Sequence, residues 1–118
     1  MKYYLAGPMS GIPQFNFPAF HAAAKNLREQ GHEVFNPAER DIERHHGVDI
    51  SADNATGNVA QAAQTHGFSL REALAEDTAY ICREADGIAM LPGWEKSNGA
   101  RAEHALAVAL GHEILYLR

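Results

Sequence analysis

The segment from Gly93 to Glu103 carries the densest chemistry in the chain, because a hydroxyl, a glycine and a carboxylate follow one another in it at fixed spacing. If a helix begins near Asn98, its free backbone N–H groups and the Ser97 hydroxyl form an anion site, and Gly99 lets a phosphate approach the backbone closely. Glu103 lies about one turn further on, and its side chain leans back toward the same ligand. One turn, about 5.4 Å, is comparable to the span of a ribose from its phosphate end to its anomeric carbon. The spacing fits a nucleoside monophosphate.

The same residues also have a purely structural interpretation. Serine is a common helix N-cap, and a glutamate in an early helical turn is favoured by the helix dipole. Without further support, the structural interpretation is the favoured one.

Alternating strand and helix patterns predict the scaffold that must position these groups. Helix- and strand-breaking pairs such as Gly7-Pro8 and Pro92-Gly93 end short apolar runs that are typical of strands. Between these runs, apolar residues recur at helical spacing. The expected strands are Lys2–Ala6, Glu33–Phe35, Asp86–Leu91 and Glu113–Leu117, and the expected helices are Phe17–Gln30, Ser69–Glu84 and Asn98–Leu110. This order predicts one α/β domain over residues 1–118, a Rossmann/flavodoxin-like three-layer sandwich with a four- to five-stranded parallel sheet. Ligands then bind beyond the carboxyl ends of the strands.

The middle of the chain has no clear periodicity. Residues 38–67 gather glycine and asparagine among polar residues, so we expect a long irregular loop or lid at about residues 38–68. Base recognition would have to come from this region, because the phosphate and sugar ends are already assigned. The sequence does not choose among Asp49, Asp53, Asn54 and Asn58 for that role.

Three blocks together resemble the nucleoside 2-deoxyribosyltransferase superfamily. They are Tyr4-Leu5-Ala6-Gly7-Pro8-Met9-Ser10-Gly11, the stretch from Asp77 to Ala85-Asp86, and Ser97-Asn98-Gly99-Ala100-Arg101-Ala102-Glu103. The first block, with Asn16, Phe20 and Asn36-Pro37, is most similar to the small, often phage-borne or prophage-borne members. The resemblance covers most of the chain except residues 38–68.

The resemblance implies a covalent mechanism with Glu103 as the nucleophile. Tyr4 and Gly7 would line the pocket, the Tyr4 hydroxyl would hold Glu103, and Asp77 would assist the departing base or hold the sugar. We expect the helix N-terminus and Arg101 to keep Glu103 ionised. Further candidates for substrate binding are Met9, Ser10, Asn36, Asp86, Trp94, Ser97 and Gly99. For Asp86 the favoured role is to cap or orient the end of the third strand, and for Trp94 simple packing is an equal alternative.

Ser97 bears on the reaction that the resemblance implies. Superfamily members that act on nucleosides tend to carry an acid six residues before the glutamate, whereas those that hydrolyse nucleoside 5′-monophosphates carry serine. A carboxylate would repel a phosphate that a hydroxyl and backbone N–H groups accept. We therefore expect an N-glycosidase acting on a nucleoside or deoxynucleoside 5′-monophosphate. A deoxyribosyltransferase that exchanges bases and a non-catalytic nucleotide-binding module are the alternatives.

Composition and charge limit the classes of partner that we expect the protein to bind. Ten Lys and Arg against fifteen Asp and Glu give a formal net charge of −5, which disfavours a nucleic acid polymer. A lone cysteine, Cys82, excludes an internal disulfide and favours the cytoplasm. The longest apolar stretch, Ala105–Leu110, is far shorter than a membrane span, so no membrane partner is expected.

Three further expectations concern metal binding, the burial of the cysteine and the oligomeric state. The histidines around Glu43-Arg44-His45-His46 and His66 lack the spacing of a recognised zinc site, so we expect neither a metal nor a cofactor. Cys82 is expected in the core. The face formed by Ala100, Ala105, Ala107 and Ala109 permits close helix approach, so a homodimer or a higher homo-oligomer is expected.

Overall fold

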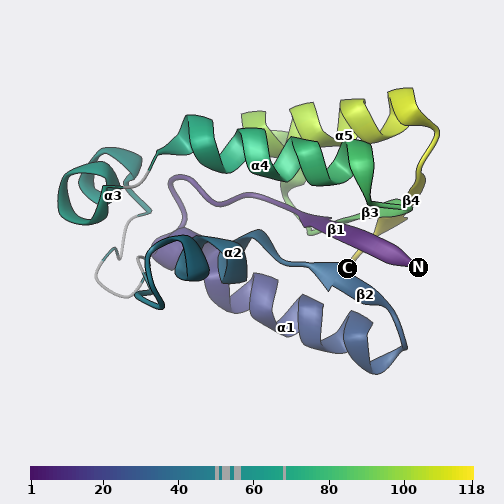
Figure 1. The fold of residues 1–118 in the computed structure, drawn as a ribbon, viewed down its shortest axis with the longest axis horizontal. Coiled ribbons are helices and arrows are strands. Elements are labelled where there is room, and N and C mark those ends of the chain that lie inside the picture. The colour runs from purple at the N-terminus through teal and green to yellow at the C-terminus, as the bar shows by residue number, and fades with distance from the viewer. Residues whose placement is uncertain (50, 52–53, 55–56, 68) are drawn as a thin grey trace.

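Four parallel strands form the central sheet of the computed structural model, which describes residues 1–49, 51, 54, 57–67 and 69–118 (Figure 1). In sheet order the strands are β2 (Glu33–Phe35), β1 (Lys2–Ala6), β3 (Gly87–Met90) and β4 (Glu113–Tyr116). Every adjacent pair is parallel. The predicted α/β class with a parallel sheet is confirmed, and the architecture is compatible with a Rossmann/flavodoxin-like sandwich.

Helices cover both faces of this sheet. Figure 1 shows α1 (Phe17–Glu29) and α2 (Pro37–Arg44) on one side, and α4 (Leu70–Arg83) and α5 (Asn98–Leu110) on the other. Helix α3 (Val59–His66) lies at the far end from the chain termini, and short 3-10 turns span Pro13–Asn16 and Trp94–Lys96. None of the described helices is long and apolar enough to cross a membrane.

Strand β1 separates the two halves of the core. Tyr3 and Leu5 pack with Phe17 and Phe20 of α1, whereas Tyr4 and Ala6 pack with residues of α4 and α5. This alternation follows from the two-residue period of a strand. It directs the Tyr4 side chain toward α5 and the Tyr3 side chain toward α1.

The expectation of a long irregular loop at residues 38–68 is wrong in part, because α2 and α3 occupy much of that range. Asn36 caps α2 by accepting a hydrogen bond from the Ala38 N–H at 2.9 Å, and Pro37 fills the first helical position. Asn58 caps α3 in the same way through the Gln61 N–H. Residues interpreted as turn and loop markers are helix caps here.

Two expectations about side-chain burial on the helices also need correction. Cys82 is exposed, because the buried positions of α4 are Ala73, Asp77 and Ile81, and the next residue along points away from that face. On α5, Ala100 and Ala107 are buried whereas Ala105 and Ala109 are exposed, so the four alanines do not form one face.

The loop after β1 has an unusual backbone. Gln14, Phe15 and Asn16 have φ angles of 56°, 51° and 61°, a left-handed conformation that costs free energy for residues with a side chain. The segment is held from outside, since the Gln14 N–H donates to the Asn54 carbonyl at 2.9 Å and the Gly11 N–H to the Gly57 carbonyl at 2.8 Å. These contacts fix the Phe15 ring in the core beside Phe17.

Candidate active site

A pocket of about 510 Å³ opens where β1 ends and α5 begins. It therefore lies at the carboxyl end of a central strand, the position expected for a parallel sheet. Eight of the eleven predicted site residues line it: Tyr4, Gly7, Met9, Ser10, Asp77, Ser97, Gly99 and Glu103. Gly7 is required sterically, because a Cβ at this position would lie 2.7 Å from the Cβ of Leu91.

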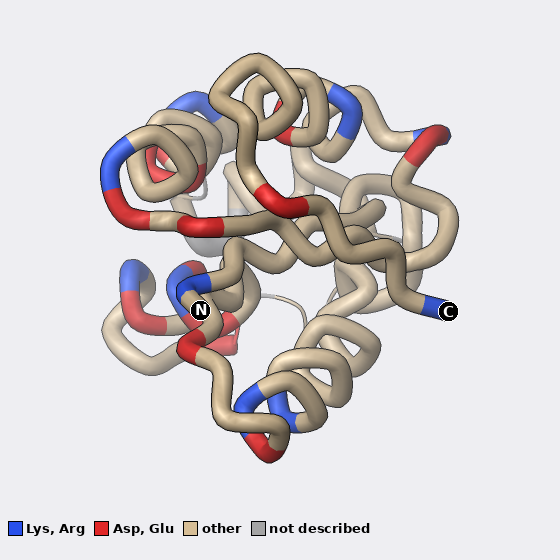
Figure 2. Tube along the Cα trace, turned by 90° about the vertical axis from the view of Figure 1, so that its right-hand side faces the viewer, with Lys and Arg blue, Asp and Glu red and all other residues tan. Residues whose placement is uncertain are grey.

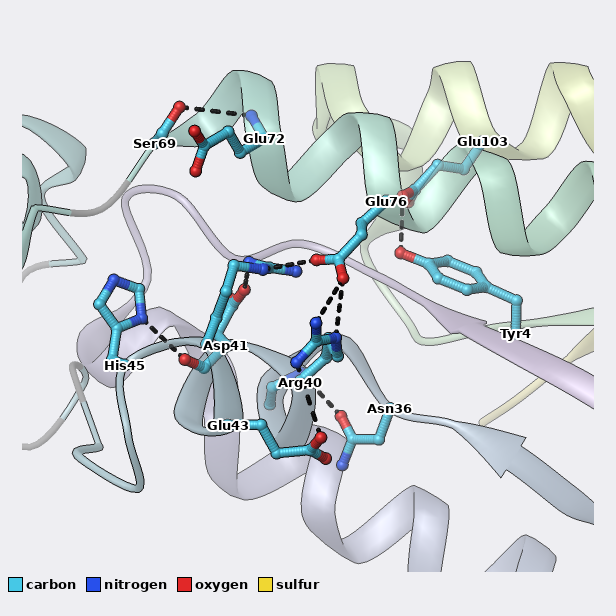
Figure 3. Close-up of polar contacts among 12 residues, drawn as sticks. Tyr4, Asn36, Arg40, Asp41, Glu43, His45, Ser69, Glu72, Glu76 and Glu103 are labelled. Atoms are coloured by element: carbon cyan, nitrogen blue, oxygen red, sulfur yellow. Dashed lines mark hydrogen bonds and ion pairs between the residues drawn. The ribbon is translucent and has the colours of Figure 1, made fainter.

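Tyr4 and Glu103 meet inside the pocket. The Tyr4 hydroxyl donates a hydrogen bond to Oε2 of Glu103 at 2.7 Å, linking β1 to α5 across 99 residues of sequence (Figure 3). Both side chains are buried, with exposed fractions of 1% for Tyr4 and 5% for Glu103. A hydroxyl donated to a carboxylate stabilises its ionised form and fixes its orientation.

Burial dominates the ionisation of the two pocket acids. It raises the pKa of Glu103 to about 8, with the charge of Asp77 adding to the rise and the Tyr4 hydrogen bond opposing it. Burial likewise raises the pKa of Asp77 to about 7. Arg101 is exposed and is not among the groups that shift the Glu103 pKa, so the expectation that it keeps Glu103 ionised is wrong.

Asp77 also carries an unused hydrogen-bonding atom. Its Oδ1 is buried and has no hydrogen-bond partner, although the residue is only 7% exposed. A buried acceptor without a partner costs free energy, so it is best explained by a group that binds there. Asp77 lies one and two turns from the pocket residues Ala73 and Leu70 on the same helix.

The first turn of α5 forms the opposite wall. Ser97 is its N-cap and accepts from the Ala100 N–H at 3.2 Å. The N–H groups of Asn98 and Gly99, next along the helix, have no intrahelical acceptor because they belong to the first turn. Lys96 also lines the pocket here, so this wall favours an anion.

Sequence reasoning missed two charged residues of the pocket lining, Lys96 and Asp41. Asp41 of α2 lines the pocket and is 5% exposed. Its carboxylate accepts from Arg44, Arg44 donates to Glu76 of α4 at 2.6 Å, and Arg40 donates to the same Glu76 (Figure 3). The cap and proline at Asn36-Pro37 could have revealed α2, but the burial of Asp41 depends on packing against α4.

The rest of the lining is largely apolar. Aromatic rings come from the β1–α1 loop and from α1, and aliphatic side chains come from α3 and α4. They are Phe15, Phe17, Phe20, Val59, Leu70 and Leu74. Such walls suit a flat aromatic group of a ligand.

The family model for a domain of unknown function, DUF4406, matches residues 1–116 of the chain. The chain belongs to the DUF4406 family. No curated protein and no solved structure matches it.

Three predicted site residues of this DUF4406 chain lie outside the pocket lining. The Asn36 side chain is buried as the cap of α2. Asp86 is exposed and accepts from the Lys2 N–H at 2.9 Å, which is the strand-end role considered for it. The Trp94 ring stacks on His104, with centroids 4.2 Å apart, and on Tyr116. All three have structural roles.

The candidates for base recognition in the middle segment that the structure describes do not line the pocket either. Asp49 accepts from the Ser51 N–H, Asn54 is bonded to the backbone of Asn58, and Asn58 caps α3. Asp53 lies outside the described residues. Among the residues that the structure describes, no group of three or more His, Cys, Asp or Glu side chains could hold a metal ion.

Proposed function

We propose that this protein hydrolyses the N-glycosidic bond of a nucleoside or deoxynucleoside 5′-monophosphate, as a member of the nucleoside 2-deoxyribosyltransferase superfamily. The observation that supports this most is the buried Tyr4–Glu103 hydrogen bond at 2.7 Å inside a pocket. A carboxylate buried without a cation reduces stability, and a nucleophile is a reason to keep it there.

In the proposed reaction, the ionised Glu103 carboxylate attacks C1′ of the sugar, and the bond from C1′ to the base nitrogen breaks. Asp77 in its protonated form gives its proton to the departing base. The raised pKa of Asp77, about 7, suits a general acid at neutral pH. Water then attacks C1′, its proton returns to Asp77, and Glu103 leaves as a carboxylate.

The phosphate end is assigned to the first turn of α5. Lys96, the Ser97 hydroxyl and the backbone N–H groups of Asn98 and Gly99 supply positive charge and donors at this wall. Glu103 projects from the next turn of the same helix, so one element sets the distance between the phosphate and the anomeric carbon. The base then packs against the aromatic and aliphatic side chains that line the rest of the pocket.

The test is incubation of the purified protein with a panel of ribo- and deoxyribonucleoside 5′-monophosphates, followed by chromatography for free base. We expect base release by the parent protein and none by Glu103→Gln. Addition of a second free base separates hydrolysis from transfer, since a transferase would form a new nucleotide. An EDTA arm tests the expectation that no metal takes part. If no nucleotide releases base, the proposal is wrong.

A homodimer or higher homo-oligomer and a cytoplasmic location remain predictions. Size-exclusion chromatography with light scattering tests the first, and localisation of the tagged protein in its own host tests the second.

A further inference from the structure

Asp41 is held rigidly at the pocket by an ion-pair network. Its Oδ1 accepts from Nη1 of Arg44. Arg44 in turn donates through Nε to Oε2 of Glu76 at 2.6 Å, and Arg40 donates to Oε1 of the same carboxylate at 2.6 Å. The network joins α2 to α4 and fixes the Asp41 carboxylate (Figure 3). Shared ion pairs lower the entropy cost of holding each side chain.

Asp41 faces the pocket, whereas the cations that hold it do not. Neither Arg40 nor Arg44 is among the residues that line the pocket. Nη2 of Arg44 is buried and without a partner, but Arg44 is not a lining residue of this pocket. The pocket therefore meets the acceptor of this ion pair and not its donor.

Asp41 and Glu103 line the same pocket from different helices. Asp41 belongs to α2 and Glu103 to α5, and these helices cover opposite faces of the sheet (Figure 1). Asp77 lines the pocket from α4, on the same face as α5. A base bonded to a sugar at Glu103 would extend across the pocket, with its far edge toward the α2 wall and Asp41.

Asp41 presents a hydrogen-bond acceptor to the pocket. Oδ1 of Asp77 in the same pocket is buried without a partner, which independently indicates that a ligand group binds there. Lys96, the one Lys or Arg among the lining residues, ends the 3-10 turn Trp94–Lys96 just before α5. A carbonyl oxygen of a ligand beside Asp41 would meet a carboxylate and no charged donor.

We infer that Asp41 determines base specificity by accepting a hydrogen bond from an exocyclic amino group on the far edge of the base. This inference rests on the proposed function, which supplies the sugar at Glu103. Cytosine and adenine nucleotides are then preferred over their keto counterparts, uracil and hypoxanthine. A buried acceptor discriminates strongly, because the wrong base leaves it unpaired or places an oxygen against it.

The first experiment uses the unmodified protein and two substrate pairs, dCMP with dUMP and dAMP with dIMP. We expect kcat/KM to be at least tenfold higher for the amino member of at least one pair. Base release at equal rates within both pairs, or faster release from the keto members, overturns the role of Asp41 and leaves the proposed hydrolysis standing.

The second experiment measures binding, so that it does not depend on turnover. Calorimetry with Glu103→Gln and the same four nucleotides should show a lower Kd for the amino member of a pair. In the double variant Glu103→Gln, Asp41→Asn, the ratio of the two Kd values should be at least tenfold smaller. Asp41→Asn presents an amide that both donates and accepts. If no nucleotide is hydrolysed but the amino preference in Kd is present and depends on Asp41, the inference holds and hydrolysis fails.

Glu39→Gln is the matched control, because it removes the same charge from the same helix at a position 38% exposed in its side chain, and its ion pair is with Arg28, outside the network. It should leave the preference unchanged. Circular dichroism checks that Asp41→Asn is folded. The inference is overturned if the amino preference persists in the folded double variant. It is also overturned if Glu103→Gln alone binds the amino and keto nucleotides with equal Kd.

Discussion

At the scale of single residues, Glu103 has an environment that stability alone would not select. Its carboxyl is buried, its neighbour Asp77 is also acidic, and Tyr4 is the partner that favours the charged form. We expect Glu103→Gln to lower turnover at least a thousandfold, about 4 kcal/mol at the transition state, with nucleotide affinity largely kept. Single-turnover assays and calorimetry measure the two effects. Turnover near that of the parent protein would remove Glu103 from the mechanism.

The same pair of acids predicts a pH profile. Glu103, with a pKa of about 8, must lose its proton to attack, and Asp77, with a pKa of about 7, must hold one to protonate the base. Activity should therefore rise and then fall with pH, with a maximum between about pH 7 and 8, and the two apparent pKa values belong to the pair. Initial rates from pH 6.5 to 9.5 avoid the phosphate titration near pH 6. A flat profile would contradict the assignment of both roles.

Residue types predicted one part of the pocket and not another. The pocket positions of Tyr4 and Asp77 were expected from the resemblance, and those of Ser97, Gly99 and Glu103 followed already from their places at the start of a helix. The ionisation of Glu103 was not predictable, because it depends on burial between packed elements and not on the adjacent Arg101. The burial of Asp41 at the pocket was not predictable for the same reason, because it depends on packing between α2 and α4.

At the scale of elements, the start of α5 decides between a phosphate and a free hydroxyl. Ser97→Asp keeps the N-cap, since aspartate caps helices as well as serine, but places a carboxylate at the proposed phosphate site. Nucleoside monophosphates should lose at least tenfold in affinity relative to the matching nucleosides, because a charge-assisted hydrogen bond contributes about 1.5–3 kcal/mol. Calorimetry with one nucleotide and its nucleoside measures the change.

Ser69→Asp is the matched control for that substitution. Ser69 caps α4 as Ser97 caps α5, and it lies outside the lining of the main pocket. Its replacement should leave the ratio of the two affinities unchanged. Equal affinity of the parent protein for nucleotide and nucleoside would mean that Ser97 is only a helix cap.

The loop after β1 depends on Gly57. This glycine has a φ of +66°, and a Cβ added to it would lie 2.1 Å from the Ile12 carbonyl oxygen. Gly57→Ala should therefore reduce the free energy of unfolding by more than about 2 kcal/mol, and it should weaken ligand binding through Phe15. Gly47→Ala is the control, because Gly47 has a φ of +86° with nothing within 4 Å of its Cβ position. Equal urea midpoints for the two variants would contradict the conclusion that the contact between Gly57 and the loop after β1 stabilises the fold.

Elements with strong periodicity or clear stops were predicted closely, and short polar helices were not. Helix α5 spans Asn98–Leu110 as expected, and β1 spans Lys2–Ala6. Helix α2 is polar over most of its eight residues, so no apolar period marks it. Its stability comes from the Asn36 cap and from ion pairs with α4, and the latter exist only in the folded chain.

At the scale of the whole molecule, the surface charges are interspersed while three acids share the interior. Figure 2 shows acidic and basic positions mixed along the trace, without a single basic face in that view. Inside, burial raises the pKa of Asp41 to about 6, of Asp77 to about 7 and of Glu103 to about 8. The folded protein therefore binds more protons than the unfolded chain between about pH 4 and 8.

This difference fixes the sign of the pH dependence of stability. Because the unfolded state binds fewer protons in that window, the free energy of unfolding must fall as pH rises through it, by a few kcal/mol in total. Glu39 and Glu76 have lowered pKa values, so their contribution is present above about pH 4.5 and is lost in more acidic solution. Stability should therefore be greatest near pH 5.

Urea unfolding at pH 5, 6.5 and 8 measures this dependence, and Glu103→Gln tests its origin. The amide cannot ionise, so the variant should lose less stability than the parent protein between pH 6.5 and 8 and should be the more stable of the two at pH 8. The same substitution that abolishes turnover would then stabilise the fold, as expected when a catalytic charge is buried at the expense of stability. A parent protein that becomes more stable from pH 5 to 8 would show that these carboxyls are ionised in the folded state.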